Sequence, residues 1–265
     1  YGRKASENDI DDLLTFYSMG AKDGGFEIGV RYALEAILSS PHFLLRMEHE
    51  PNEITPGDVY TLDDIALAKR LSFFIWGTNP DAELLRLANQ GKLSRNRVLK
   101  AQVQRMLADP RSEALATRFA SLWLRLQDLE KVEPDSFSFP NYSQQLMTAM
   151  RRETELFFYN LVREDRSMLE LYNANYSFLN QRLAEHYGIP NVLGEEFRKV
   201  EYTDGQRRGI LGHGSILVQT SLGNRTSPVL RGKWVLEVLL GAPPPPPPPG
   251  IPDLEETVGS ESGRI

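Results

Sequence analysis

The stretch Ser143-Gln-Gln-Leu-Met-Thr-Ala-Met-Arg-Arg-Glu-Thr-Glu-Leu-Phe-Phe-Tyr-Asn-Leu-Val162 decides the fold class of this 265-residue chain. One side of it is mainly apolar, with residues at three- and four-residue spacing: Leu146, Met150, Thr154, Phe157 and Leu161. This spacing brings side chains to one face of an α-helix, whereas a half-buried strand would need strict alternation. The sequence therefore predicts a long helix from Ser143 to about Val162.

The same helical period recurs over most of the chain. It predicts helices near residues 6–16, 26–38, 42–48, 65–76, 94–106 and 115–123, another opening at Pro80, and helical pieces over 167–187. Ser6 with Asp9 predicts a capping box, and Ser94 is the expected cap of the helix that follows it. A short strand is expected near 197–202, and 210–218 fits either a strand or a helix. The predicted fold is mainly α, with bundle-like helical domains and a short irregular or β element near 197–218.

Proline- and glycine-containing connections divide the chain. We expect an N-terminal helical domain at 1–50, a central helical domain at 61–190, a basic domain at 191–241 and a linker at 242–265. The linker contains seven consecutive prolines. Because proline fixes φ and lacks an N–H, this run predicts a polyproline II segment that leads toward a further C-terminal region.

Composition excludes several functional classes. The net charge of −6 argues against general nucleic-acid binding, and no apolar run approaches the ~18 residues of a membrane span. The absence of cysteine excludes disulfides, thiolate zinc sites and covalent haem attachment within this chain. Since the chain opens at Tyr1 without a signal peptide, we expect it to be a piece of a longer protein.

Positive charge is concentrated in one segment. Residues 205–236 contain no acidic side chain, yet they carry five cations: Arg207, Arg208, Arg225, Arg231 and Lys233. The rest of the chain therefore holds the whole acidic excess. This asymmetry predicts a local surface that faces an anion.

Five motifs in series carry a resemblance to a known family. They are Ser40-Pro-His-Phe43, Arg70-Leu-Ser-Phe-Phe-Ile-Trp76, Met106-Leu-Ala-Asp-Pro-Arg111, Glu185-His-Tyr-Gly188 and Arg225-Thr-Ser-Pro-Val-Leu-Arg-Gly-Lys-Trp-Val-Leu-Glu237. Together they resemble the planctomycete-type cytochrome c domain family, large secreted bacterial proteins built mostly from domains of unknown function. The resemblance implies a periplasmic or extracellular location and haem c attached outside this chain. It also implies haem-bearing domains of the same parent protein as partners.

The densest polar cluster lies in the basic domain. Its members are Asn224, Arg225, Thr226 and Ser227, followed by Arg231 and Lys233. Arginine presents a planar fork that suits a carboxylate, a phosphate or a haem propionate, so the cluster is a candidate anion- or haem-contacting site. The alternative is a structural role, in which Arg225 pairs with a buried acid and Thr226 or Ser227 caps the helix after Pro228.

Histidine and serine offer weaker candidates. His42, Met47 and His213 are candidate axial haem ligands, because imidazole and thioether both bind haem iron. His42 is otherwise expected to pack or cap a helix. His213, between two glycines, could instead carry a proton or occupy a turn, and Ser215 beside it suggests a hydrolase only if a third, acidic group orients His213. Glu153 and Glu155, two apart on a helix, are not expected to form a catalytic pair.

Two functions from different classes follow. The first is a scaffold portion of a secreted c-type cytochrome-like protein that serves electron transfer or haem-dependent oxidation, with a redox partner. The second is a cell-surface interaction or carbohydrate-binding module without redox activity, which would contact a surface polymer through an exposed aromatic platform. Neither involves nucleic acid.

Overall fold

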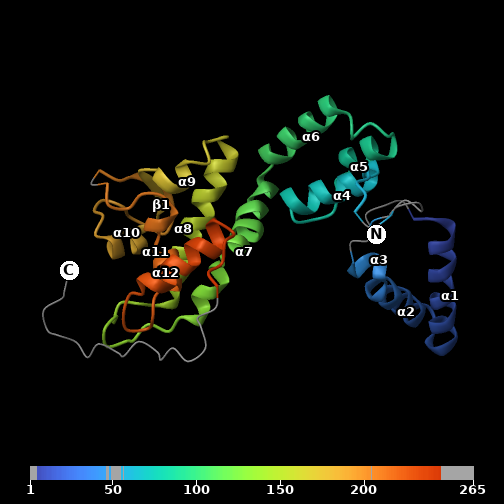
Figure 1. Ribbon diagram of the computed structural model, residues 1–265. Helices are drawn as coiled ribbons and strands as arrows, with labels where there is room; N and C mark the ends of the chain where they lie inside the picture. The colour runs from blue at the N-terminus through green and yellow to red at the C-terminus, as the bar shows by residue number, and fades with distance from the viewer. Residues whose placement is uncertain (1–4, 46–47, 49–54, 56, 204, 246–265) are drawn as a thin grey trace, which may run out of the picture.

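The computed structural model describes residues 5–45, 48, 55, 57–203 and 205–245. The fold is mainly α, as the sequence predicts, and its described sheet has two short strands. Three groups of helices follow one another in Figure 1, with helices α4 to α6 between the N-terminal helices α1 to α3 and the C-terminal body. No helix in these residues combines the length and apolar character needed to cross a membrane.

The N-terminal group is a helical hairpin. Helix α1 (Glu7–Gly24) and helix α2 (Phe26–Ser39) pack along their lengths, and the short α3 (Pro41–Leu44) follows. The predicted capping box between Ser6 and Asp9 is confirmed. The two helices approach closely at Gly20, where a Cβ atom would lie 2.6 Å from the carbonyl oxygen of Ile28. Only glycines are buried in the hairpin, so its apolar side chains remain largely exposed.

The middle group contains α4 (Asp64–Ile75), α5 (Ala82–Asn89) and α6 (Asn96–Ala108). Asp63 and Asp81 cap α4 and α5 through their side chains. The predicted cap at Ser94 is wrong, because α6 begins two residues later and Arg95 stands at its N-cap without a side-chain hydrogen bond. The Ser94 amide instead donates to the Asp64 carboxylate, which pins this loop to the start of α4.

Irregular helix joins this group to the body. A 3₁₀ turn (Pro110–Glu113), a π-helical segment (Leu115–Ala120), α7 (Ser121–Trp123) and a second 3₁₀ turn (Leu126–Lys131) follow one another. The sequence predicts helix over 115–123, but its period does not distinguish π from α winding. Within the middle group, the indole N–H of Trp76 at the end of α4 donates to the Met106 carbonyl of α6 at 2.9 Å.

The body is built around α8 (Gln144–Arg163), which confirms the predicted helix; Ser143 caps it through its side chain. Helix α9 (Glu170–Asn173), strand β1 (Tyr176–Leu179), helix α10 (Gln181–Tyr187) and strand β2 (Arg198–Glu201) follow. The two strands pair antiparallel, with Tyr176 opposite Glu201. Strand β2 confirms the predicted strand. The helical prediction for 167–187 is wrong at β1, where four residues pair with a strand about twenty positions away.

The C-terminal segment closes the body. Residues 210–218, left open between strand and helix, form a 3₁₀ turn (Ile210–Gly212) and α11 (Gly214–Gln219). Helix α12 (Pro228–Trp234) continues into a π-helical turn (Val235–Leu239). Trp234 and Val238 pack into the same apolar core as Phe157 of α8, so this segment and the long helix share one interior. The predicted polyproline run covers residues 243–249. Its part after Pro245 lies outside the described residues.

Candidate functional site

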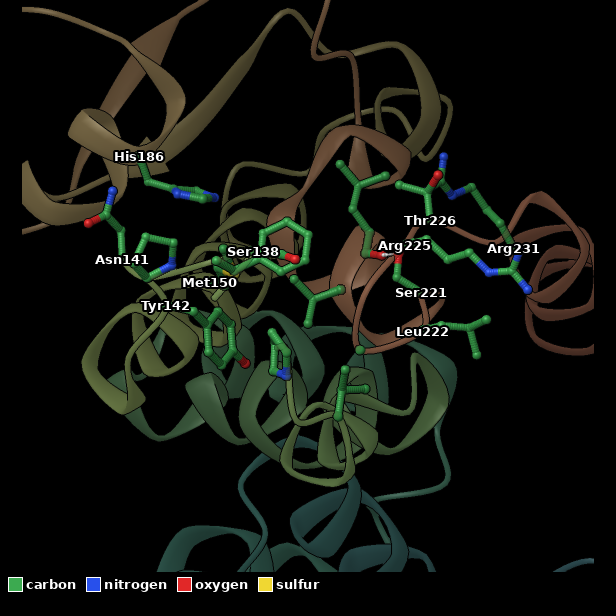
Figure 2. Close-up of a pocket in the computed structure, with 17 residues that line it drawn as sticks. Ser138, Asn141, Tyr142, Met150, His186, Ser221, Leu222, Arg225, Thr226 and Arg231 are labelled. Atoms are coloured by element: carbon green, nitrogen blue, oxygen red, sulfur yellow. Dashed lines mark hydrogen bonds between the residues drawn. The ribbon is translucent and has the colours of Figure 1, made fainter. Parts of the chain in front are cut away.

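A pocket of about 530 Å³ opens between the 132–142 loop, α8, the end of α10 and residues 217–231 (Figure 2). We call it the Arg231 pocket. Most of its lining is apolar or aromatic: Val132, Pro134, Phe139, Pro140, Tyr142, Met150, Leu217, Val218 and Leu222. Its polar lining includes Ser138, Asn141, His186, Ser221, Arg225, Thr226 and Arg231. A mainly apolar cavity of this size with a few polar groups is typical of a small-molecule site.

A tight turn builds one wall of the pocket. Ser221 and Thr226 form an isolated antiparallel bridge, and the Leu222 amide donates to the Arg225 carbonyl at 2.9 Å. The turn is held against the 132–142 loop, because the Asp135 amide donates to the Gly223 carbonyl at 2.8 Å. A Cβ atom at Gly223 would lie 2.7 Å from the Glu133 carbonyl oxygen, so only glycine fits this approach.

Two arginines from this segment line the pocket. Among the described residues, neither Arg225 nor Arg231 forms an ion pair, and Arg231 Nε is buried without a hydrogen-bond partner. Unpaired buried donors of this kind are costly unless a ligand or water satisfies them. Arg231 therefore leaves a charge-assisted donor without a partner, and the exposed Arg225 adds a second cation to the pocket lining.

The predicted polar cluster divides in the structure. Arg225, Thr226 and Arg231 line the pocket, whereas Ser227 caps α12 by accepting from the Leu230 amide at 3.2 Å. Lys233 lies 3.6 Å from the Glu237 carboxylate on the exposed side of α12. Asn224 is exposed at the tip of the turn and does not line the pocket. Ser227 therefore has the capping role of the structural alternative, and the anion-contacting role of the pocket-lining residues stays a prediction.

The end of the pocket opposite the arginines is lined by a different set of polar groups. Figure 2 shows Asn141, Tyr142 and His186 on one side, with Arg225, Thr226 and Arg231 on the other. The Tyr142 hydroxyl is buried and has no hydrogen-bond partner, and its burial raises the pKa of Tyr142. Desolvation, and then the charge of Arg207, lowers the pKa of His186. Near neutral pH the phenol is therefore a donor and the imidazole is uncharged.

Directly behind the pocket lies a buried polar cluster, which we call the Glu153 network. It comprises Glu153, Thr154, Ser177, Tyr187, His213 and Ser215. Ser177 and Tyr187 donate to the two oxygens of the Glu153 carboxyl group, at 2.8 and 2.6 Å. Glu153, Ser177 and Ser215 are fully buried, and His213 is only 1% exposed.

His213 sits between two hydroxyl groups. Its Nδ1 lies 2.9 Å from Thr154 Oγ1, and its Nε2 lies 3.3 Å from Ser177 Oγ. Because the Ser177 hydroxyl donates to Glu153, the Nε2–H of His213 is the group that donates to Ser177, and Nδ1 accepts from Thr154. The ring packs edge-on against Phe157, with centroids 5.0 Å apart. Both ring nitrogens are thus engaged by protein hydroxyls.

Burial sets the charge of the network. Desolvation raises the pKa of Glu153 to about 7, although Tyr187, Ser177 and Arg207 oppose this shift. Desolvation, and then Arg207, lowers the pKa of His213 to about 3. Below neutral pH the stable pair is a protonated carboxyl and a neutral imidazole, whose closest N–O approach is 4.0 Å.

The network does not have the arrangement of a hydrolase. Ser215 Oγ contacts Thr154 Oγ1 at 2.7 Å, and Thr154 stands between Ser215 and the imidazole. Glu153 lies near His213, as the hydrolase alternative requires, but Ser215 is fully buried. A nucleophile must hydrogen-bond its base and reach a substrate carbon, and this serine does neither. The geometry fits a polar core that fixes α8, β1, α10 and α11 together.

Pocket and network share their supporting elements. Helix α8 contributes Met150 to the pocket and Glu153 to the network, one turn apart. Helix α10 places His186 in the pocket and Tyr187 in the network. Helix α11 begins at Gly214, whose amide donates to the Tyr187 hydroxyl at 2.7 Å, and its later turn lines the pocket. The hydrogen bonds of the Glu153 network therefore hold together α8, α10 and α11, the three helices that form the floor of the pocket.

Sequence reasoning missed much of this site. Tyr142 and Ser177 belong to no motif of the sequence, and Tyr187 appeared only within the Glu185–Gly188 motif, without a role of its own. Glu153 did carry one, since it lies three residues after Met150 and four before Phe157, on the apolar face of α8. Glu155 points elsewhere and accepts from Ser121 at 3.1 Å.

Two candidate haem ligands from the sequence remain. His42 is exposed in α3, and Met47 falls outside the described residues. Over the part of the chain that the structure describes, no group of histidine and acidic side chains is arranged to hold a metal ion.

Three family models match the chain in series. Residues 1–48 match PSD5, a protein of unknown function (DUF1595), and residues 62–189 match PSD4, a protein of unknown function (DUF1592). Residues 207–264 match PSCyt3, a protein of unknown function (DUF1588). No curated protein and no solved structure matches the chain.

Proposed function

The chain belongs to the planctomycete cytochrome c-associated domain families of unknown function, and from this premise we propose that it is the scaffold portion of a secreted c-type cytochrome-like protein. In this role its Arg231 pocket holds an organic anion during electron transfer or haem-dependent oxidation. The anion is the carboxylate of a substrate or the propionate edge of a haem carried by another part of the parent protein. A periplasmic or extracellular location belongs to the same proposal.

One observation carries the proposal. Arg225 and Arg231 line a mainly apolar pocket and form no ion pair with any described acid, although the chain as a whole is acidic. The partly buried guanidinium of Arg231 attracts an anion more strongly than one in open water, because the local dielectric is lower beside apolar walls. An anionic group with an apolar body satisfies both features at once.

In this proposal a haem contacts the pocket through its propionate edge. The chain has no cysteine, so a covalently attached haem would be bound outside it. His213 offers iron no ring nitrogen, because Thr154 and Ser177 already contact both. The two pocket arginines, in contrast, match the charge and planar geometry of a propionate carboxylate. A haem would supply one-electron chemistry, and this chain would position its periphery.

The test uses the full-length parent protein, expressed with the cytochrome c maturation machinery. A pyridine haemochrome spectrum first measures how much haem c each chain carries. The variants Arg225→Gln and Arg231→Gln are then expected to shift the haem reduction potential or to weaken organic-anion binding. Lys233→Ala is the matched control, since it removes one positive charge from the same helix outside the pocket. A parent protein without haem c, or unchanged potential and anion affinity in both arginine variants, would refute the proposal.

A second candidate function is supported by the loop at the pocket rim. Phe137 is 94% exposed and Phe139 is 45% exposed, which gives the aromatic platform that a carbohydrate- or surface-binding module requires. This function predicts that Phe137→Ala weakens retention on an immobilised polysaccharide while leaving organic-anion binding intact. Equal retention of the variant and the unmodified protein would exclude it.

A further inference from the structure

The residues that line the Arg231 pocket restrict the chemical class of its ligand beyond an organic anion. This inference rests on the proposed anion-binding function. The pocket is polar at two separate ends. Arg225, Thr226 and Arg231 lie at one end, and Asn141, Tyr142 and His186 lie at the other (Figure 2). A ligand that satisfies both ends must be elongated and must carry different groups at its two tips.

The cationic end selects an anion. Arg231 Nε is buried and unpaired, and Arg225 has no acidic partner among the described residues. A carboxylate carries a single charge that two guanidinium groups can neutralise. A doubly charged phosphate would lose more hydration on entering a cavity whose lining is mainly apolar. The carboxylate is therefore the favoured anion.

The opposite end selects a hydrogen-bonding group. The Tyr142 hydroxyl is buried without a partner, and the neighbouring Asn141 amide and neutral His186 ring can both donate and accept. A hydroxyl on the ligand can accept from Tyr142 and donate to Asn141 or His186. A second charged group there would find no counter-charge among the pocket-lining residues.

The middle of the pocket selects flat rings. Its lining there includes Phe139, Pro134, Pro140 and Met150. Aromatic rings and thioether sulfur make favourable contacts with flat π systems. A cavity of about 530 Å³ lies within the range for drug-sized ligands, so a single ring would leave much of it unfilled.

We propose that the Arg231 pocket binds an aryl carboxylate with two aromatic rings and a hydroxyl group at the end opposite the carboxylate. The carboxylate pairs with Arg231 and Arg225. The rings lie between the 132–142 loop and α11, and the hydroxyl contacts Tyr142. The Glu153 network behind α8 and α10 keeps this floor in place.

The probe is a hydroxybiphenyl carboxylate whose two polar groups occupy opposite para positions, titrated into the intact chain by calorimetry. Two analogues each lack one group: biphenyl carboxylate and hydroxybiphenyl. Loss of the carboxylate, or the change Arg231→Gln, is expected to weaken binding about tenfold or more, as for a charge-assisted hydrogen bond. Tyr142→Phe is expected to weaken binding of the hydroxylated acid about fivefold and to leave biphenyl carboxylate unaffected.

The controls separate failure of this inference from failure of the proposed function. Lys233→Ala should leave all affinities unchanged, and far-UV circular dichroism checks that each variant is folded. A straight-chain carboxylate that binds as tightly as the probe would overturn the aryl class. Equal affinities of both acids for Tyr142→Phe and the unmodified chain would overturn the hydroxyl contact. In either case, arginine-dependent binding would leave the anion site standing. If no carboxylate binds in an arginine-dependent way, the aryl-carboxylate inference fails, and the haem reduction potentials of the arginine variants in the parent protein decide the proposed function.

Discussion

The Glu153 network predicts a specific dependence of stability on pH, which the change Glu153→Gln isolates. Glutamine keeps the shape of a protonated glutamic acid and can still accept from Ser177, but it does not titrate. Burial raises the pKa of Glu153 from 4.5 to about 7, so the folded state holds this proton more tightly than the unfolded chain. The resulting stabilisation is fully present below pH 4.5 and is lost as pH rises to about 7.

The magnitude follows from the size of this shift. A shift from 4.5 to about 7 corresponds to a contribution of about 3 kcal/mol. The free energy of unfolding of Glu153→Gln, measured relative to the unmodified chain, should therefore increase by about that amount between pH 4 and pH 8. Urea titrations followed by tryptophan fluorescence measure it, because Trp76 and Trp234 are buried in the core.

The change His213→Asn is a control in which the pH dependence of stability has the opposite sign. The pKa of His213 is lowered from 6.5 to about 3, so its stabilisation is present above pH 6.5 and is lost as pH falls toward 3. Relative to the unmodified chain, His213→Asn should therefore gain stability as pH falls over that range. Parallel stability curves for the unmodified chain and Glu153→Gln between pH 4 and pH 8 would refute the reasoning about the buried carboxyl.

Two further changes test local features of the fold. Ser143→Ala removes the side-chain cap of α8 and should lower the free energy of unfolding by about 1 kcal/mol, whereas Ser94→Ala should change it little, because Ser94 caps no helix. Equal losses in the two variants by urea denaturation would contradict this assignment. Gly209→Ala should lower the thermal midpoint by several degrees, since Gly209 has a φ of 57° and a Cβ atom there would collide with the backbone at Leu171 and Tyr172. An unchanged midpoint in calorimetry would show that this backbone can move aside.

The parts of the fold that local chemistry determines were predictable from the sequence. Helix α8 has both a regular apolar face and a capping serine, so its type and its ends follow from nearby residues. Strand β1 has only four residues and depends on β2 for its hydrogen bonds, so no local pattern identifies it. The strand prediction succeeded at β2 because its extended segment stands apart from helical periodicity.

The site depends on contacts between distant segments. The Asp135 amide meets the Gly223 carbonyl, and this contact brings the 132–142 loop to the 221–226 turn. Arginines at 225 and 231 marked one side of the pocket in the sequence, but nothing local indicated that Tyr142 would lie at the other end. Charged side chains are rarely buried, so the place of Glu153 on the apolar face of α8 did not by itself predict its burial. Only the packing of β1 and α10 against that helix shows why it is inside.

The two halves of the site lead to a final prediction about anion affinity. Met150 lines the pocket and Glu153 lies one turn further along α8, so the charge of Glu153 acts close to a bound anion. The charged and titratable groups around Glu153 are Tyr187, His213, Tyr202 and Arg207, and of these only Arg207 is charged between pH 6 and pH 8. As Glu153 loses its proton near pH 7, its negative charge opposes the anion and offsets Arg207.

We therefore expect organic-anion affinity to fall a few-fold from pH 6 to pH 8 in the unmodified chain. Calorimetric titrations of Glu153→Gln should show a constant affinity over this range. An equal fall in the affinity of the variant would show that the charge of Glu153 does not act on an anion in the pocket.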